Sequence, residues 1–460
     1  MHNDNLLALL KKYDQEGPRY TSYPPAPVFS EAFGPKEYQT HIAAVNSVDK
    51  ANEISLYLHL PFCDTLCYFC GCTMLISNDR ARIHTYVEYI KREVSFVAKQ
   101  IAPSTRVVQM HWGGGSPTHL TPAEIADLGL HVRKEFTFAS DAEVSIEIDP
   151  RGLTLDHILA LEKVGFNRAS IGVQDFDPHV QQAVNRVQPE AMTRQVIEWC
   201  RAHGMQNINL DLIYGLPYQT AESFEHTLDL ILGLNPDRLA IYNIAYLPRL
   251  KPHQRLIEIE TLPAAKEKLN LLGLAITRLE QAGFEYIGMD HFARPNDELA
   301  IARREGTLQR NFQGYSTRAG ADLYGFGMSS ISRVGNCFAQ NVKTIPEYYQ
   351  AIDERRFATH AGYQMSKDDE IRERVIMELM CALHLNIPEL EEAFGIEFQD
   401  YFSSSIAMLD QFEADSLVVV TNSAIEILPL GRFFLRNIAM TFDAYLTELR
   451  KTKKLFSRTV

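Results

Sequence analysis

A barrel-like α/β core is the fold that this 460-residue sequence predicts, on the strength of two patterns. From about residue 54, short runs rich in β-branched and aromatic residues alternate with longer stretches of helical periodicity. Several helical stretches end in a glycine that leads directly into the next strand, as in Val164-Gly165-Phe166 and Ala282-Gly283-Phe284. Successive βα units build a parallel sheet, and right-handed crossovers close or half-close that sheet into a barrel.

The elements of this core can be placed in chain order. The expected strands are Ile54–Leu60, Val107–His111, Glu143–Ile148, Arg168–Val173, Asn207–Tyr214 and Arg238–Ile244. The clearest helices between them are Tyr86–Lys99, Pro122–Phe136, Leu155–Val164 and Ala221–Leu234. Six βα units in a row therefore predict a partial (β/α)6 barrel of the TIM type.

The two ends of the chain differ from the core. The segment Gly17–Pro25 is rich in turn residues, but its arginine and tyrosines are untypical of a disordered leader. We expect it to lie over another surface as an extended arm. Near the C-terminus, helical stretches precede a hairpin formed by Leu417–Val420 and Ala424–Leu428, and a final helix is expected over Phe433–Lys451. This order resembles a winged-helix arrangement.

The sequence thus divides into four parts. They are an N-terminal arm (1–50), the barrel core (51–295), a connecting segment that completes the site (296–365) and a mainly helical C-terminal domain (366–460).

Composition and charge exclude several classes of protein. The apolar fraction of 46% and charged fraction of 22% are typical of globular proteins. No apolar run approaches the roughly 18 residues that span a bilayer, and Met1–Lys12 lacks the pattern of a signal peptide, so we expect a cytoplasmic protein without a membrane span. The net charge is −13, without a basic stripe, which argues against a nucleic-acid partner. An anionic substrate would need a local basic field.

Four of the seven cysteines, Cys63, Cys67, Cys70 and Cys72, fall in one short loop directly after the first expected strand. Because cytoplasmic proteins rarely keep disulfides, this cluster predicts a metal site. Structural zinc usually takes two separated pairs of ligands, whereas four thiols in one aromatic loop favour an iron–sulfur cluster. If only Cys63, Cys67 and Cys70 bind iron, the fourth iron stays open to a small molecule.

The spacing C-x3-C-x2-C in this loop resembles that of the radical S-adenosylmethionine (SAM) superfamily. Further segments resemble one family within it, oxygen-independent coproporphyrinogen III oxidase, over essentially the whole chain. They are the arm Pro18–Pro24, the fourth cysteine in Cys70-Gly71-Cys72, and the segments Met289–Pro295 and Asn311–Tyr315. The fold implied by this resemblance is a partial (β/α)6 radical SAM barrel.

The resemblance also implies cofactors and their ligands. Cys63, Cys67 and Cys70 would hold a [4Fe-4S] cluster, Cys72 would not ligate iron, and the open iron would chelate SAM. Two SAM molecules per chain are implied. The first would contact Tyr57, Gly114, Glu147 and Ile331. The second would contact Phe69, Gly115, Ser116, Gln174, Arg186, Asp211 and Ala245, with Ser116 standing where relatives carry threonine. No side chain is implied as a catalytic acid or base.

Some of these residues carry a signal of their own. A run of three glycines, Gly113-Gly114-Gly115, follows a strand and permits a close backbone approach to a ligand, although a tight turn also needs glycine. Glu147 near a strand end suits an ammonium or ribose hydroxyls, or else a salt bridge. Asp211 interrupts an apolar run, where a carboxylate requires a partner. Three histidines near these segments are expected to be hydrogen-bonded core residues, namely His59, His111 and His291.

The implied activity is the oxygen-independent oxidative decarboxylation of two propionates of coproporphyrinogen III to vinyl groups, giving protoporphyrinogen IX by 5′-deoxyadenosyl radical chemistry. An electron-donor protein such as flavodoxin or ferredoxin is implied as partner, and a monomer is expected. Arg19, Arg294 and Arg310 are candidates to bind the substrate propionates. Two alternatives remain: a related haem-binding chaperone, whose members lack the Pro18–Pro24 arm and usually the fourth cysteine, and a zinc-stabilised scaffold without catalysis.

Overall fold

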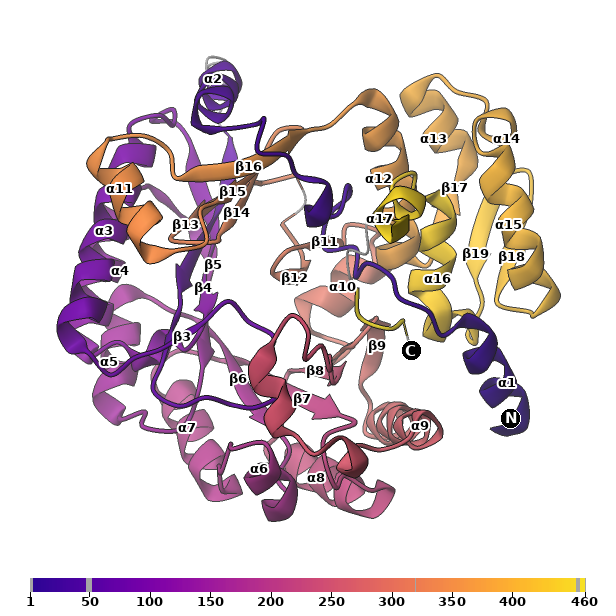
Figure 1. Ribbon diagram of the computed structural model, residues 1–460, viewed down its shortest axis with the longest axis horizontal. Coiled ribbons are helices and arrows are strands. Elements are labelled where there is room, and N and C mark those ends of the chain that lie inside the picture. The colour runs from indigo at the N-terminus through magenta and orange to yellow at the C-terminus, as the bar shows by residue number, and fades with distance from the viewer. Residues whose placement is uncertain (1–2, 47–51, 319, 452–455, 460) are drawn as a thin grey trace.

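The structure, a computed structural model, describes residues 3–46, 52–318, 320–451 and 456–459. Within these residues, a 12-stranded sheet runs in the order β16-β15-β14-β13-β1-β4-β5-β6-β7-β8-β10-β9. The parallel strands that were expected lie together in its middle (Figure 1). They are β1 (Glu53–Leu60), β4 (Arg106–Gly114), β5 (Phe138–Ile148), β6 (Arg168–Gln174), β7 (Asn207–Tyr214) and β8 (Arg238–Asn243).

Helices cover the outer face of this curved sheet, as Figure 1 shows. They are α3 (Arg80–Ala98), α4 (Pro122–Glu135), α5 (Leu155–Val164), α6 (Pro178–Ala183), α7 (Glu190–Ala202), α8 (Ala221–Gly233) and α9 (Ala265–Gln281). Their ends follow from local chemistry. Thr121 and Glu124 form a reciprocal capping box at the start of α4. After α5, Gly165 adopts a left-handed conformation (φ 90°) that glycine tolerates without steric cost.

The connecting segment extends the sheet. Its strand β13 (Asp322–Phe326) pairs in parallel with β1, Ile54 opposite Asp322, and three antiparallel strands follow. These are β14 (Ile331–Val334), β15 (Cys337–Asn341) and β16 (Thr359–Gln364). At the other edge, β10 (His291–Ala293) and β9 (Glu285–Gly288) add antiparallel to β8. The two edge strands do not pair with each other within the described residues, so the barrel is partial, as predicted.

Shorter elements connect these strands. They are β2 (Phe62–Cys63), β3 (Leu75–Ile76), η2 (Pro117–His119), η3 (Pro252–Leu256), η4 (Ile259–Thr261), α10 (Glu298–Arg304), β11 (Gln309–Asn311), β12 (Gly314–Ser316) and α11 (Ile345–Asp353).

The C-terminal region forms a separate body at the right of Figure 1, mainly helical, with a three-stranded sheet in the order β17-β19-β18. Its elements are α12 (Lys367–Ala382), β17 (His384–Asn386), α13 (Ile387–Phe394), α14 (Phe398–Tyr401), α15 (Ser403–Ala414), β18 (Val418–Val420) and β19 (Ala424–Ile427). The hairpin β18–β19 lies where it was expected.

The expected final helix over Phe433–Lys451 is wrong. Four short elements replace it: η5 (Gly431–Phe434), α16 (Leu435–Ala439), η6 (Met440–Phe442) and α17 (Leu446–Lys451). The interruption falls at Asp443, which has an extended backbone. Its carboxylate accepts the N–H groups of Tyr445 and Leu446 and also the hydroxyl of Tyr20 in the arm. The Asp443 side chain caps the next helix and binds the arm, and these contacts hold its backbone out of the helical conformation. The expected single helix is therefore interrupted at this residue.

The N-terminal arm contains helices α1 (Asn3–Tyr13), η1 (Ala26–Val28) and α2 (Pro35–Asn46). Between them the extended segment lies against the C-terminal body, as expected for an arm, and Tyr20 and Tyr23 are 1% and 0% exposed. Beside it runs the C-terminal tail, where Glu16 and Arg458 form an antiparallel bridge. Both chain ends therefore lie on the same side of the molecule (Figure 1).

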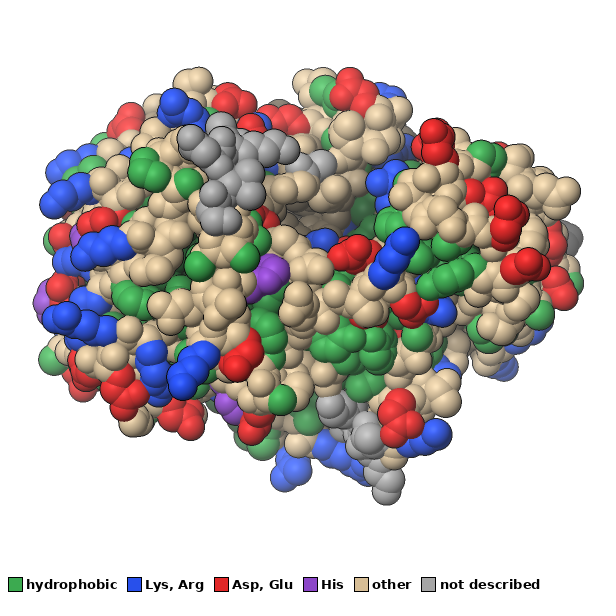
Figure 2. Space-filling view, turned by 90° about the horizontal axis from the view of Figure 1, so that it is seen from above, with side chains coloured by type: hydrophobic (Ala, Val, Ile, Leu, Met, Phe, Trp, Pro, Cys, Tyr) green, Lys and Arg blue, Asp and Glu red, His purple; other side chains and the backbone are tan. Residues whose placement is uncertain are grey.

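Two large apolar clusters stabilise these parts. One fills the space between the barrel strands and their helices, and the other joins the arm, α12 and the C-terminal body. Acidic and basic side chains are interspersed over the face in Figure 2, with acidic ones gathered on the side of the C-terminal body. Within the described residues, no helix has the length and apolar character needed to cross a membrane.

Candidate active site

The cysteine loop begins where β1 ends, at the carboxyl edge of the parallel sheet. Strand β2 carries Cys63 and pairs with β3, so the two ends of the cysteine loop lie side by side. The carbonyl of Cys63 accepts the N–H of Ser77 at 3.0 Å. Cys67 is buried, Cys63 and Cys70 are half-buried and Cys72 is exposed. The loop thus holds three sheltered thiols and one exposed cysteine.

Two arginines and one carboxylate stand beside Cys67. Arg151 Nη2 and Arg186 Nη1 lie 3.3 and 3.6 Å from its Sγ. Asp149, directly after β5, binds both guanidinium groups, at 2.7 Å from Arg151 and 3.0 Å from Arg186. Arg186 is 7% exposed and also donates to the carbonyl of Gly172 at 2.6 Å. Two guanidinium groups are therefore fixed beside the Cys67 sulfur.

The other thiols differ in acidity. A hydrogen bond from the Cys72 side chain, opposed by burial, lowers the pKa of Cys70 to about 6. Burial and the nearby Cys70 and Cys67 raise the pKa of Cys63 to about 12. Cys63 and Cys70 therefore differ in how readily they ionise, and a bound metal would favour the thiolate form of both.

Next to this loop, the glycine run at the end of β4 packs against Glu147 of β5. Gly114 has φ +115° and donates its N–H to Glu147 Oε2 at 3.2 Å. A Cβ at Gly113 would stand 2.9 Å from Glu147 Oε1, so a larger residue there would displace this carboxylate. Burial opposes the charge of Glu147, but hydrogen bonds from His111 and Gly114 hold its pKa below the usual value. Glu147 is therefore an anion that a positively charged group could bind.

The same carboxylate borders a cavity of about 140 Å³ inside the barrel, which Asp211 of β7 also lines. Asp211 accepts hydrogen bonds from Ser170 Oγ and Asn209 Nδ2, both at 2.9 Å. Burial raises its pKa to about 6. Two carboxylates on different strands thus face one polar space.

A buried glutamine joins the cysteine loop to the loop after β8. The side-chain amide of Gln254, which is 0% exposed, donates to the carbonyls of Phe69 at 2.9 Å and Ala245 at 2.8 Å. Its neighbour His253 lies 2.8 Å from the carbonyl of Cys70, and Lys251 donates to the carbonyl of Cys72. The 3-10 helix η3 thereby fixes the far side of the cysteine loop.

Comparison with known proteins identifies this arrangement. The family model for the radical SAM superfamily matches residues 57–231, and that for the HemN C-terminal domain matches residues 365–434. Oxygen-independent coproporphyrinogen III oxidase from Synechocystis sp. is 45% identical over 98% of this chain and 97% of its own length. The Escherichia coli protein of that name is 44% identical over 99% and 98%. The chain belongs to the oxygen-independent coproporphyrinogen III oxidase family.

A solved structure agrees with this membership. Coproporphyrinogen III oxidase (HemN) from Escherichia coli, described as a radical SAM enzyme, superposes with a TM-score of 0.91, covering 96% of this chain and 99% of that chain. The predicted family and fold class are therefore confirmed.

Membership of this family implies a [4Fe-4S] cluster and SAM, and the residues present fit both. Three sheltered cysteines, with two arginines at one of them, form a donor set suited to iron. Among the described residues, no three His, Cys, Asp or Glu side chains converge on one point as ligands of a single metal ion. Thiolates of a cluster bind different iron atoms and need not converge. Carboxylates and glycine backbone beside the loop suit the ammonium and hydroxyl groups of SAM.

The structure brings the predicted SAM residues into one continuous region at the carboxyl edge. The backbone N–H groups of Gly115 and Ser116 donate to Leu60 and Phe62, at the start of the cysteine loop. Tyr57 stacks on His111, which bonds to Glu147. Gln174 ends β6 next to Gly172, the partner of Arg186. Ile331 reaches this region through β13, whose Gly325 lies against the Ile331 carbonyl and pairs with Tyr57.

The three histidines have different environments. His59 bonds to the carbonyl of Thr73 at 2.9 Å, and His111 bonds to Ser145 at 2.7 Å. Both are hydrogen-bonded as predicted. His291 differs, because its Nδ1 is buried without a partner among the described residues. Burial and the nearby Arg310 hold the pKa of His291 well below its usual value, so the ring is neutral.

The arginines suggested for the propionates lie in three places. Arg19 forms an ion pair with Asp290 near the ends of β7 and β8. Arg310 is buried beside Tyr315, with Nε and Nη1 unpartnered among the described residues. Arg294 follows Ala293, which pairs with the first residue of β8, so it lies at the opposite end of the sheet from the cysteine loop. Arg294 is therefore the wrong candidate.

Sequence reasoning missed Asp149, Arg151 and Gln254. Asp149 and Arg151 stand directly after a strand of the barrel, a position typical of functional residues, so they could have been found. Gln254 carries no such signal, since η3 lies in an irregular loop and its partners are backbone carbonyls.

Proposed function

We propose that this protein carries out the oxygen-independent oxidative decarboxylation of two propionate side chains of coproporphyrinogen III to vinyl groups, which yields protoporphyrinogen IX. The observation that carries this proposal is the cysteine loop at the carboxyl edge of the partial barrel, with Arg151, Arg186 and Glu147 beside it. Relatives named for this activity match nearly the whole chain, arm and C-terminal body included.

Each propionate loses one hydrogen atom from its β-carbon and carbon dioxide, and gives one electron to a separate one-electron acceptor. When bound, the cluster and SAM supply the 5′-deoxyadenosyl radical that takes this hydrogen atom, with one SAM consumed for each propionate. Cys63, Cys67 and Cys70 would hold the cluster. Arg151 and Arg186 stabilise negative charge at Cys67, and Asp149 fixes both guanidinium groups.

Around the loop, other residues orient SAM and exclude water. Tyr57, Gly114, Glu147 and Ile331 would contact the SAM on the cluster. A second SAM would contact Phe69, Gly115, Ser116, Gln174, Arg186, Asp211 and Ala245. Support for two molecules comes from two carboxylates on different strands, Glu147 of β5 and Asp211 of β7, which could each contact one SAM. No side chain is needed as general acid or base, because a hydrogen atom and not a proton leaves the substrate.

The remaining parts of the proposal concern partners. A flavodoxin or ferredoxin would deliver single electrons, with Cys72 at the exposed side of the loop. A cytoplasmic monomer fits these partners.

Anaerobic turnover tests the proposal. Protein with reconstituted iron and sulfide, given coproporphyrinogen III, SAM and a reductant, should form protoporphyrinogen with two molecules each of methionine and 5′-deoxyadenosine. The haem-binding alternative predicts tight haem binding and no vinyl product, and a zinc scaffold predicts a colourless protein without sulfide. The arm residues Tyr20 and Tyr23, buried here, favour the enzyme over the haem carrier.

A further inference from the structure

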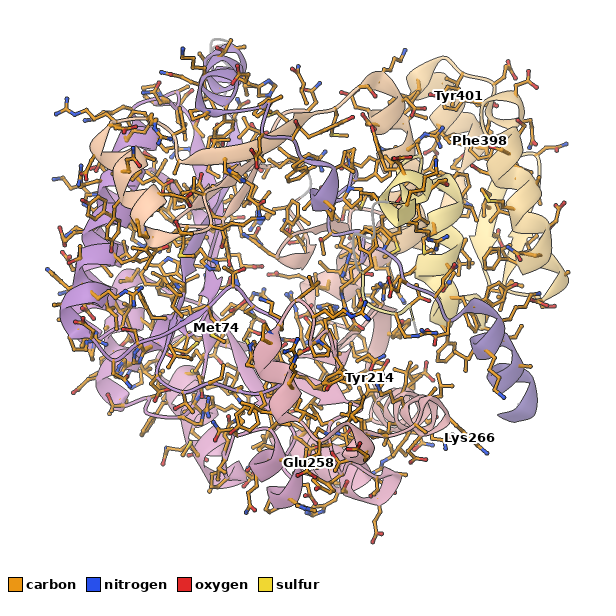
Figure 3. The ribbon with its side chains drawn as sticks, in the orientation of Figure 1. Met74, Tyr214, Glu258, Lys266, Phe398 and Tyr401 are labelled. Atoms are coloured by element: carbon orange, nitrogen blue, oxygen red, sulfur yellow. The ribbon has the colours of Figure 1, made fainter. Side chains whose placement is uncertain are left out.

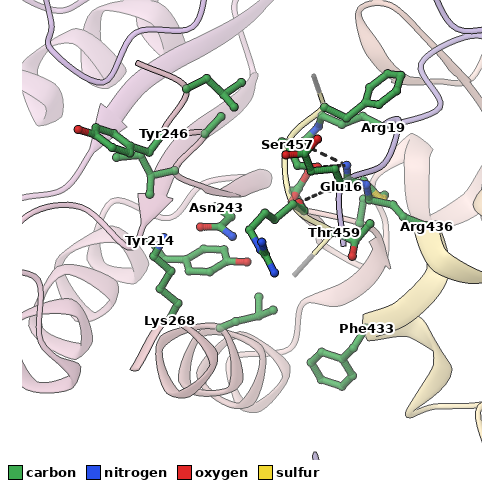
Figure 4. A pocket seen from close by; sticks show the side chains of 18 of the residues that line it. Glu16, Arg19, Tyr214, Asn243, Tyr246, Lys268, Phe433, Arg436, Ser457 and Thr459 are labelled. Carbon is green, nitrogen blue, oxygen red and sulfur yellow. Dashed lines mark hydrogen bonds and ion pairs between the residues drawn. The ribbon is translucent and has the colours of Figure 1, made fainter. Parts of the chain in front are cut away.

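A basic pocket of about 480 Å³ lies between the barrel and the C-terminal body. Its walls come from the ends of β7 and β8, from α9, from the arm and from the C-terminal tail (Figure 4). Among its described lining residues are two carboxylates, Glu16 and Asp290, and five cations. The cations are Arg19, Lys268, Arg432, Arg436 and Arg458. In a chain of net charge −13, this is the local positive field that an anionic substrate needs.

Three of the five cations already have partners. Arg19 forms an ion pair with Asp290, and Arg458 forms one with Asp14 at 2.6 Å. Arg436 donates to backbone carbonyls of the arm and tail, including Pro18 at 3.0 Å and Arg458 at 2.8 Å. These three arginines therefore hold the walls of the pocket together.

Lys268 and Arg432 are different. Neither side chain makes a hydrogen bond or salt bridge within the described residues, although both line the pocket and are half-buried. The Nε of Arg432 is buried without a partner there. Leaving a buried guanidinium N–H unpaired is costly, so this side chain is suited to bind an anionic ligand in the pocket. Burial also lowers the pKa of Lys268, which a bound anion would counter.

The pocket is linked to the cysteine loop through one of its wall residues. Ala245 belongs to its wall, and the buried amide of Gln254 joins the carbonyl of Ala245 to that of Phe69 in the loop. One buried side chain therefore joins the wall of the pocket to the cysteine loop. The volume is within the range of pockets for small organic ligands, about 300–1,000 Å³.

We propose that Lys268 and Arg432 bind the propionate carboxylates that the reaction leaves intact, and so position the tetrapyrrole for attack on the other two. This inference rests on the proposed function. A carboxylate that leaves as carbon dioxide must break any ion pair it makes, whereas a retained carboxylate stays paired through the reaction. Lys268 and Arg432 come from the barrel and the C-terminal body, so the substrate would bridge the two parts.

Porphyrin binding tests this without turnover. The reconstituted anaerobic protein is titrated with coproporphyrin III, which has four carboxylates, and with protoporphyrin IX, which keeps only the two that survive. Lys268→Met with Arg432→Gln should weaken the binding of both porphyrins by about 10- to 100-fold, as expected for losing charge-assisted hydrogen bonds. The control is Lys266→Met, on the exposed side of α9, which Figure 3 shows at the edge of the molecule. It should change neither affinity by more than about twofold.

Conservative variants separate positioning from folding. Lys268→Arg and Arg432→Lys keep the charges and should retain most of the affinity, and the Michaelis constant for coproporphyrinogen III should rise in the charge-removing variants but not in these. Weakened binding of coproporphyrin alone would overturn the proposal, because the residues would then hold the reacting propionates. Weakened SAM binding with unchanged porphyrin binding would overturn it too, since the carboxylate in the pocket would be that of SAM. Unchanged binding of all three ligands also overturns it. If the wild-type protein binds porphyrins but forms no vinyl product, the proposed function fails separately.

Discussion

Arg186 Nη1 lies 3.6 Å from Cys67 Sγ and 3.0 Å from Asp149 Oδ2, so one guanidinium connects a cysteine of the loop to the end of β5. The resemblance assigns Arg186 to the second SAM together with Asp211. In the structure the two residues differ, because Asp211 bonds to Ser170 and Asn209 and, among the described residues, makes no hydrogen bond to the cysteine loop. Substitutions at the two positions should therefore have different effects.

Asp211→Asn should keep a full iron content and reduce SAM binding from two molecules to one. Arg186→Ala should lower the iron content as well, because Cys67 loses one of two neighbouring cations. Removing a buried charge partner costs about 2–5 kcal/mol, which weakens binding some tens- to thousands-fold. Iron analysis and anaerobic equilibrium binding of SAM measure both effects. Arg194→Ala, on the exposed side of α7, is the control. Two SAM molecules on Asp211→Asn would show that the assignment is mistaken.

Three of the four cysteines in the loop should be needed for the cluster, and the fourth, Cys72, should not. Cys63→Ala, Cys67→Ala and Cys70→Ala should each abolish the cluster and the activity, because three thiolates are the smallest set that leaves one iron open. Cys72→Ala should retain nearly normal iron, because its side chain is exposed and the other three thiols are kept. Iron and sulfide content with the visible absorption spectrum decide the matter. An iron loss in Cys72→Ala as large as in Cys63→Ala would contradict the division.

Local patterns in the sequence predicted most of the barrel. The strand Asn207–Tyr214 and the helix Leu155–Val164 were predicted with their observed ends, because turn or cap residues stand next to each element in the sequence. The cysteine loop was equally easy to predict, because its cysteines are close together in the sequence. By contrast, β13 pairs with β1 across more than 260 residues, and no local pattern indicates such a partner.

The remaining errors have the same origin. The helix expected over Phe433–Lys451 ends early because Asp443 caps α17 and binds Tyr20, a residue of the distant arm. Gln254 escaped detection because it acts through backbone carbonyls, which every residue possesses. Contacts that depend on tertiary structure are invisible to periodicity and spacing.

The raised pKa of Asp211 should make the stability of the folded protein depend on pH. Burial raises its pKa to about 6, above its ordinary value of 3.8, so the folded state holds this proton more tightly than the unfolded state. The contribution of Asp211 to the free energy of unfolding should therefore fall as the pH rises from about 4 to about 6, and stay level above. Asp211→Asn removes this dependence.

Urea unfolding of the cluster-free protein between pH 4.5 and 7.5 measures the difference between wild type and Asp211→Asn. The variant should gain stability relative to wild type up to about pH 6 and hold that gain beyond. Asp175, whose pKa burial also raises to about 6, titrates in both proteins and cancels in the difference. A difference that is independent of pH would mean that Asp211 titrates in its ordinary range.

Arg436 holds the two ends of the chain together. Its guanidinium donates to the carbonyls of Gly17 and Pro18 in the arm and of Ser457 and Arg458 in the tail. Replacing it with methionine, which has a similar length, leaves these carbonyls without their donor. We expect Arg436→Met to lower the free energy of unfolding by about 3 kcal/mol, since hydrogen bonds to a charged group contribute about 1.5–3 kcal/mol each and partly compensate when lost.

The arm and the tail also line the basic pocket. Arg436→Met should therefore expose the arm to proteases and raise the Michaelis constant for coproporphyrinogen III. The iron content should stay normal. The control is Arg450→Met, which removes an exposed arginine that donates to Gln15 and Glu16 of the same arm. An exposed contact of this kind contributes about 0–1 kcal/mol, so this variant should resemble wild type. Urea unfolding and limited proteolysis, with cleavage mapped around Gly17, distinguish the two. If Arg436→Met resisted proteolysis as well as Arg450→Met does, the arm and tail would be held by their mutual backbone bonds, such as Thr459 N–H to the Gln15 carbonyl at 2.8 Å, and not by the guanidinium.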